Sequence, residues 1–217
     1  MRFLLSLLLG PHLFWVLLAI IIYLFRGQIL YFMELNTRQR AHLNFLKEQT
    51  LNRYDAKARF ELGLNQFKWG NYPKAIILFQ EAVTIDPDQH DCHYYLGLAY
   101  QRTKNFSLAL AELTRCLELK PDYLYGQVWL KLGDICYQQR DFPGALAYYQ
   151  KMLTVNPYEG EALYKIGLTY YNLAQKDEAK AYLNRAISEI KTLPHFRYNK
   201  DRQWLYKARL IKLFGRF

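Results

Sequence analysis

Cysteine is scarce in this chain of 217 residues, and its placement excludes several kinds of site. Cys92, Cys116 and Cys136 stand 24 and 20 residues apart. An odd number at such spacings argues against a disulfide framework and against a zinc site of paired cysteines. We expect the three thiols to be small core residues of a protein in a reducing compartment.

Catalytic signatures are also missing. The sequence has no P-loop, no G-x-S-x-G and no H-E-x-x-H pattern, so we predict that the chain is not an enzyme and uses no cofactor. The net charge of +10 is unevenly spread: residues 56–194 are nearly neutral, whereas residues 195–217 carry seven Lys or Arg and one Asp. A neutral central region offers no basic track for a nucleic-acid backbone, which makes nucleic acid an improbable partner.

One long apolar run is present, at the N-terminus. Residues 3–25 contain no formal charge, and as a helix they would span about 34 Å, enough to cross a hydrocarbon core of about 30 Å. A cleaved signal peptide is the alternative, but the run is longer than such a segment needs and lacks a small-x-small cleavage pattern. Residues 1–26 are therefore predicted to be a retained single-pass anchor. Three arginines follow the run (Arg26, Arg38 and Arg40), whereas one precedes it (Arg2). Because positive charge favours the cytoplasmic side of a membrane, the remainder of the chain is predicted to lie in the cytoplasm.

Residues 56–193 repeat one pattern four times. Each copy has an aliphatic residue followed by glycine, at Gly63, Gly97, Gly133 and Gly167, with spacings of 34, 36 and 34 residues. An Ala, a bulky residue and a third apolar residue follow at helical spacing, and Pro87, Pro121 and Pro157 close three copies. A fixed period of this length indicates stacked pairs of helices, because one pair cannot bury its apolar face alone.

This pattern resembles the tetratricopeptide repeat (TPR) family, whose unit is a 34-residue pair of antiparallel helices. The resemblance implies an all-α chain: a transmembrane helix, then a right-handed α-solenoid of about four hairpins, then a capping helix. The expected segments are the anchor (1–26), a juxtamembrane helix or half-repeat (27–55), repeats 1 to 4 (56–89, 90–125, 126–159 and 160–193) and a basic C-terminal helix (194–217). Each glycine is expected where a first helix approaches its partner closely, since a helical glycine otherwise costs about 1 kcal/mol.

In this family the first helices line the concave face, where partner segments bind. Carried over, that implies an aromatic, lightly charged groove, of which we expect about half to be packing between neighbouring helices. Its positions are Phe60, Leu64, Phe67, Lys68, Tyr94, Leu98, Gln101, Arg102, Leu130, Asp134, Tyr137, Tyr164, Leu168 and Tyr171. Family members that clamp a chaperone C-terminus use Lys and Asn there; Phe60, Leu64 and Tyr95 stand at those positions, so that function is not expected.

The run His90-Asp91-Cys92-His93 contains metal-ligating residue types one helical turn apart. It opens the second repeat, and His93 falls where a bulky packing residue belongs. A structural role is therefore favoured, and no metal site is predicted.

After Pro194 the sequence predicts one more helix, opened by Asn199 or Asp201, in which Trp204, Ala208 and Ile211 share a face that seals the last repeat. This basic tail has two interpretations: a capping helix with a solvated basic face, or a contact with anionic lipid headgroups. Its cations are Arg197, Lys200, Arg202, Lys207, Arg209, Lys212 and Arg216. The sequence as a whole predicts a membrane-tethered scaffold that binds an unidentified protein segment. The alternative is a self-assembling organiser of the membrane surface that uses the tail.

Overall fold

The computed structural model describes residues 15–16, 20, 43–44 and 54–215. The chain divides into two compact units, residues 1–53 and 54–217. The described residues of the first unit are helical. The rest of the predicted anchor (1–26) lies outside the described residues, as does the rest of the predicted half-repeat (27–55) except Tyr54 and Asp55. Among the described residues, no helix has both the length and the apolar character needed to cross a membrane.

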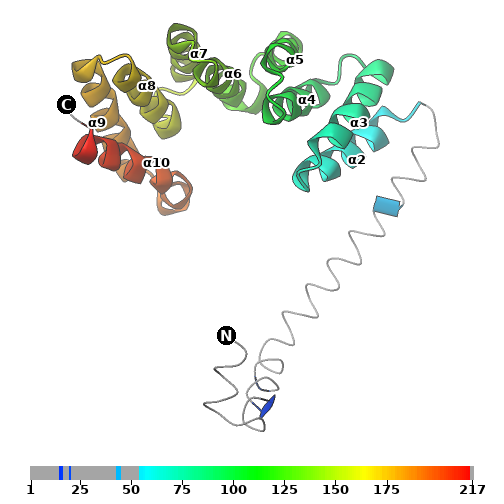
Figure 1. Cartoon of the computed structure of the whole chain (residues 1–217), viewed down its shortest axis with the longest axis horizontal. Coiled ribbons are helices and arrows are strands. Elements are labelled where there is room, and N and C mark those ends of the chain that lie inside the picture. Colours follow the sequence, from blue (N-terminus) through cyan, green and yellow to red (C-terminus); the bar gives the residue numbers. More distant parts are fainter. Residues whose placement is uncertain (1–14, 17–19, 21–42, 45–53, 216–217) are drawn as a thin grey trace. The chain divides into compact units, whose positions relative to one another are not determined.

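Residues 54–215 fold entirely into helices and turns, with no strand in that range. In Figure 1 the helices follow one another as a bowed row of pairs from α2 to α9, and the last helix lies against α8 and α9. The all-helical prediction is confirmed for this part of the chain. The helices are α2 (Ala56–Lys68), α3 (Tyr72–Ile85), α4 (His90–Arg102), α5 (Phe106–Leu119), the 3-10 turn η1 (Tyr123–Gly126), α6 (Gln127–Gln138), α7 (Phe142–Val155), α8 (Gly160–Asn172), α9 (Lys176–Thr192) and α10 (His195–Phe214).

Three residues connect the two helices of each pair, and the middle one is always left-handed. Its φ is 79° at Gly70, 62° at Lys104, 63° at Arg140 and 59° at Ala174. Only glycine adopts this conformation without a steric cost, so the sequence marks the turn clearly in the first pair alone. The backbone N–H groups of the turn bond to carbonyls at the end of the first helix, which satisfies donors that the chain reversal would otherwise leave unpaired.

The connection between the second and third pairs is longer than the others. Two extra residues, Leu124 and Tyr125, have φ values of 51° and 50°, and Gly126 follows at 81°. Three successive left-handed residues turn the chain into α6 and leave both inserted side chains exposed. The insertion is accommodated in this turn, so α5 and α6 on either side of it are uninterrupted helices.

Close helix packing within each pair follows from the glycine. A Cβ atom added at Gly133 would lie 2.4 Å from a ring carbon of Tyr149, which α7 inserts against α6. Ala145 and Tyr149 are both buried, one helical turn apart on α7. The same buried pairing of an Ala with a bulky residue four positions later recurs in α3, α5 and α9. The predicted reason for the glycines is thus confirmed.

The C-terminal helix α10 begins at His195, before the predicted starting points Asn199 and Asp201. Pro194 precedes it, and proline fits the beginning of a helix because its missing N–H would have no partner there. As expected for a capping helix, Ala208 is buried against α8 and α9, with Trp204 and Ile211 packed beside it. The last repeat therefore does not expose its apolar face to water.

Candidate functional site

The predicted groove residues differ widely in their exposure, even though all lie on first helices. Lys68, Arg102 and Tyr171 are exposed. Seven are partly buried: Leu64, Phe67, Leu98, Gln101, Asp134, Tyr137 and Leu168. The remaining four are buried: Phe60, Tyr94, Leu130 and Tyr164.

All four buried residues belong to hydrophobic core clusters. Leu130 is 0% exposed within the cluster that contains Cys136, Ala145 and Tyr149, so its predicted place on the partner-binding surface is wrong. Phe60 directs its ring at Phe79, with 5.8 Å between centroids. Both positions face the core because neighbouring first helices pack on each other as well as on their own partners. No partner can reach Leu130 without unfolding the repeat.

Tyrosine rings pack against one another along α4 and the inserted turn η1. The Tyr94 ring contacts those of Tyr95 and Tyr123 edge to face, with centroids 5.3 and 5.4 Å apart. Burial raises the pKa of Tyr94 to about 12. The Tyr123 hydroxyl donates a hydrogen bond to Asp91. These aromatic residues therefore pack against one another within the fold. Such packing was expected for about half of the predicted groove residues.

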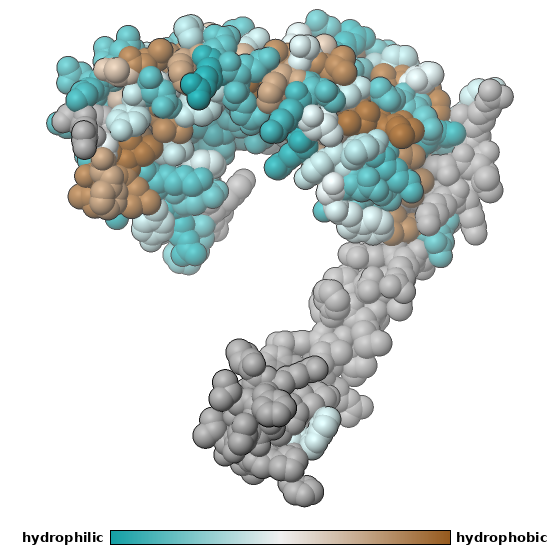
Figure 2. Space-filling model, in the orientation of Figure 1, coloured by the Kyte–Doolittle hydropathy of each residue, from teal (hydrophilic) through white to brown (hydrophobic). Residues whose placement is uncertain are grey.

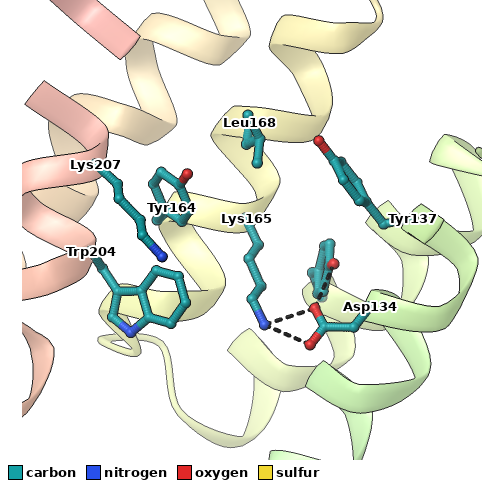
Figure 3. Close-up of a pocket in the computed structure, with 8 residues that line it drawn as sticks. Asp134, Tyr137, Tyr164, Lys165, Leu168, Trp204 and Lys207 are labelled. Carbon is teal, nitrogen blue, oxygen red and sulfur yellow. Dashed lines mark hydrogen bonds and ion pairs between the residues drawn. The ribbon is translucent and has the colours of Figure 1, made fainter. Parts of the chain in front are cut away.

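A cavity of about 210 Å³ lies where α6, α8 and α10 meet (Figure 3). Its lining combines four predicted groove residues with four that the groove prediction did not include. The lining residues are Asp134, Tyr137, Tyr149, Tyr164, Lys165, Leu168, Trp204 and Lys207. We call this cavity the α6–α8–α10 pocket. It is the place where the predicted groove and the basic tail converge.

Charges inside the α6–α8–α10 pocket are largely paired. Lys165 lies 2.7 Å from the Asp134 carboxylate and 2.7 Å from that of Glu161. The Tyr149 hydroxyl donates to Asp134 at 2.9 Å. Figure 3 shows both of these contacts to Asp134 as dashed lines. Burial, followed by the nearby Asp134 charge, raises the pKa of Tyr149, so its hydroxyl keeps its proton and remains a donor.

Lys207 is different, because its ammonium group faces an aromatic ring instead of a carboxylate. Its Nζ atom lies 4.3 Å from the centroid of Trp204, within the range of a cation–π contact. Lys165 approaches the same ring at 5.5 Å. Within residues 54–215, Lys207 takes part in no ion pair, so one cation at the pocket remains without a counter-charge.

A second hollow, of about 890 Å³, borders the inserted turn. It is lined by Tyr94, Leu124, Tyr125, Gln127, Lys131, Val155, Asn156, Glu159 and Arg197. Burial raises the pKa of Glu159, and the nearby Arg197 partly opposes that shift. The Arg197 guanidinium lies 3.4 Å from Glu159 and 3.8 Å from Asp201. Arg197 is thus paired with two carboxylates within the fold, and its contact with an anionic surface stays a prediction.

The other tail cations fall into several environments. Arg202, Lys207 and Arg209 are exposed, whereas Lys212 donates a hydrogen bond to Asn184 of α9. Arg216 and the side chain of Lys200 lie outside the described part of the chain. Figure 2 shows a hydrophobic patch over the C-terminal end of α10, where Leu210, Leu213 and Phe214 are exposed.

The His90–His93 run is divided among separate contacts. His93 bonds through Nδ1 to Glu112 at 2.7 Å and through Nε2 to the carbonyl oxygen of Pro87 at 2.9 Å. The Cys92 thiol donates to the carbonyl oxygen of Phe79, and His90 lies edge-on to Tyr123. The contacts account for His93 and Cys92 as structural residues that join α4 to its neighbours.

Comparison with family models identifies the repeats. Models described as TPR repeat and tetratricopeptide repeat match residues 63–104, 94–160 and 161–189, which together follow α2 to α9. The four helix pairs are tetratricopeptide repeats. The family resemblance inferred from the glycine and alanine spacing is therefore confirmed.

Several curated proteins with TPR segments are similar to this chain. A TPR repeat-containing protein, MJ1428, of Methanocaldococcus jannaschii is 21% identical over 140 residues, which are 64% of this chain and 24% of that protein. The Hsp70-Hsp90 organising protein of Plasmodium falciparum is 26% identical over 150 residues, 68% of this chain and 58% of that protein. The human PEX5-related protein is 34% identical over 70 residues, 32% of this chain and 11% of that protein. The chain thus spans only part of each relative.

Solved structures share the TPR fold. MamA superposes with a TM-score of 0.66 at 22% identity, covering 72% of this chain and 93% of that chain. The first TPR of Spaghetti (RPAP3), bound to the HSP90 peptide SRMEEVD, has a TM-score of 0.52 at 23% identity and covers 56% of this chain and 95% of that chain. At such identities the similarity establishes the arrangement of helices.

Sequence reasoning missed part of the site on the fourth TPR. Lys165 was not among the groove residues, although Glu161, Tyr164, Lys165 and Leu168 follow the i, i+3, i+4, i+7 spacing of one helix face. That stripe was the available signal. Trp204 was assigned to the capping face alone, and no repeat pattern extends into α10 to show that it also borders the groove.

Proposed function

We propose that this chain is a membrane-tethered TPR scaffold whose first helices bind a segment of a partner protein, as a peptide or an amphipathic helix. The observation that carries the proposal is the run of partly buried side chains along α2, α4, α6 and α8, which ends in the α6–α8–α10 pocket. Partly buried aromatic groups such as Phe67 and Tyr137 offer contact area at little cost in rotamer entropy, which is typical of binding hot spots.

The comparisons support a peptide ligand without identifying it. One structurally similar TPR holds an HSP90 peptide, SRMEEVD. In this chain Phe60 and Leu64 occupy positions where a chaperone clamp needs Lys and Asn. We therefore expect that peptide to bind weakly or not at all, and an apolar or amphipathic segment to be preferred.

Membrane tethering is the second part of the proposal, and its support is the uncharged run of residues 3–25. The arginines that follow this run favour a cytoplasmic location for the repeats. Protease treatment of sealed cells and of inverted vesicles tests both statements. Protection of residues 54–217 in cells and digestion in inverted vesicles is the expected result, whereas release of the chain by alkaline carbonate would contradict the anchor.

Selection from a library of short random peptides tests the binding function. The selected peptides should lose affinity about fivefold or more for Leu98→Gln, because Leu98 is a partly buried groove position on α4. Leu108→Gln is the matched control, since Leu108 is exposed on the second helix α5. Equal losses for both variants, at unchanged melting temperature, would contradict the proposed groove.

The alternative function, contact with a membrane surface through α10, is supported by one observation. Leu210, Leu213 and Phe214 are exposed at the end of this helix beside the exposed Arg209, which is the composition of an interfacial segment. The unit 54–217 should then float with vesicles that contain anionic phosphatidylserine and detach in high salt. A unit that ignores such vesicles and remains monomeric at every concentration rules this alternative out.

A further inference from the structure

The size of the α6–α8–α10 pocket limits what can enter it. Its volume is about 210 Å³, and a cavity of about 150 Å³ in another protein is known to bind benzene. One aromatic side chain therefore fits, and two do not. The rings of Tyr137, Tyr164 and Trp204 form much of the wall, with Leu168 between them (Figure 3).

Electrostatics make one side of the pocket suited to an anion. Lys165 already has two carboxylate partners, Asp134 and Glu161, each at 2.7 Å. Lys207 has none within the described residues, and its ammonium group is held near the pocket by the Trp204 ring. An ammonium group has three donors, so a cation–π contact leaves it free to bind a carboxylate at the same time.

We propose that the α6–α8–α10 pocket takes one aromatic side chain of a partner segment and that Lys207 pairs with an acidic residue adjacent to it. The preferred segment thus has the chemistry of an aromatic residue flanked by Asp or Glu. This inference rests on the proposed binding function and adds the partner's local chemistry. It also gives α10 a binding role, because this helix supplies both Trp204 and Lys207.

Three capped pentapeptides test the proposal: Ser-Asp-Phe-Asp-Ser, Ser-Asn-Phe-Asn-Ser and Ser-Asp-Ala-Asp-Ser. Each is titrated against the full chain in lipid nanodiscs, with the tryptophans replaced by 5-fluorotryptophan and followed by fluorine NMR. We expect the first peptide to shift the Trp204 signal and to bind about fivefold more tightly than the second, a difference of one exposed ion pair. The alanine peptide should leave the signal in place.

Variants on α10 identify the cation. Lys207→Gln should remove the preference for the Asp peptide over the Asn peptide. Arg209→Gln is the matched control: it removes an equal charge from the same helix at a residue that does not line the pocket, and should preserve the preference. Trp129, which borders a separate cavity with Lys151, provides an internal reference signal.

The proposal is overturned if no peptide shifts the Trp204 signal, if the shift appears at Trp129 instead, or if the Asp preference survives Lys207→Gln. These outcomes are separable from failure of the proposed function. Peptides selected from the library that depend on Leu98 but not on Lys207 would leave the groove in place and refute only this assignment. A library that yields no peptide dependent on Leu98 would refute the groove itself.

Discussion

Replacing Gly133 by alanine is the sharpest test of how these repeats pack. Alanine is the better helix former by about 1 kcal/mol, so helix propensity alone predicts a more stable protein. The added Cβ, however, would lie 2.4 Å from one carbon of the Tyr149 ring and 2.5 Å from another. Carbon atoms attract each other best at about 3.5–4.0 Å, so the ring has to move by about 1 Å.

The surroundings leave the Tyr149 ring little room to move. It is 1% exposed, and its hydroxyl group is hydrogen-bonded to Asp134 at 2.9 Å. Overpacking of this kind costs about 1–3 kcal/mol, and a tethered, buried ring places Gly133→Ala near the upper end. After the gain in propensity is subtracted, we expect the free energy of unfolding to fall by about 2 kcal/mol.

Urea unfolding of the unit 54–217, followed by far-UV circular dichroism, measures this change. Gly133→Ala is repeated in a Tyr149→Leu background, where the ring is gone and the loss should shrink by more than about 1 kcal/mol. Gly70→Ala is a control for backbone effects: no atom lies within 4 Å of the added Cβ, but the φ of 79° disfavours alanine by about 1 kcal/mol. If Gly133→Ala stabilises the protein in the wild-type background, the argument from close packing is wrong.

Three further predictions concern individual side chains. The hydrogen bond to Glu112 raises the pKa of His93 above 6.5. The contribution of protonated His93 to the free energy of unfolding is therefore complete below pH 6.5 and is lost as the pH rises through the raised pKa. Burial raises the pKa of Cys92 and Cys116 to about 12, and both thiols should resist iodoacetamide at pH 8 until the protein unfolds. Asp141 accepts a hydrogen bond from the backbone N–H of Gly144 at 3.0 Å, so Asp141→Ala should cost about 1 kcal/mol.

Each of these has a control and a contrary result. His93→Gln should flatten the pH dependence of urea unfolding, and an unchanged slope would refute the assignment. Rapid alkylation of the native protein, located by peptide mass spectrometry, would contradict the thiol prediction. Asp122→Ala is the matched control for the helix cap, since Asp122 precedes η1 without a side-chain cap bond; equal losses for the two Asp variants would show that capping is not the cause.

The sequence predicted the helices and their pairing because the repeat is a local code. Each unit of about 34 residues contains both halves of the packing pattern. A glycine stands on the first helix, and an Ala followed four residues later by a bulky residue stands on the second, as Gly133 and Tyr149 illustrate. The same period predicted which helices would be first in each pair. Where no period applies, the prediction was weaker: α10 begins at His195 instead of at Asn199 or Asp201.

The exposure of the groove residues depends on their place in the repeat. Phe60, Tyr94, Leu130 and Tyr164 each stand three residues before the glycine of their repeat, and all four are buried. Leu64, Leu98, Asp134 and Leu168 each stand one residue after it, and all four are partly buried. Both sets were assigned to one groove, because apolar spacing alone does not show which side of a first helix is covered by its neighbours.

By itself, then, the sequence determined the helical repeats, because each repeat is specified by contacts within itself and with its nearest neighbour. Only the tertiary structure decided that Lys207 and Trp204 of α10 meet Lys165 and Tyr164 of α8 around one pocket. These residues lie about 40 positions apart, on elements with no shared period. Their meeting is fixed by the angle at which the last helix packs, which follows from side-chain shape across the whole interface.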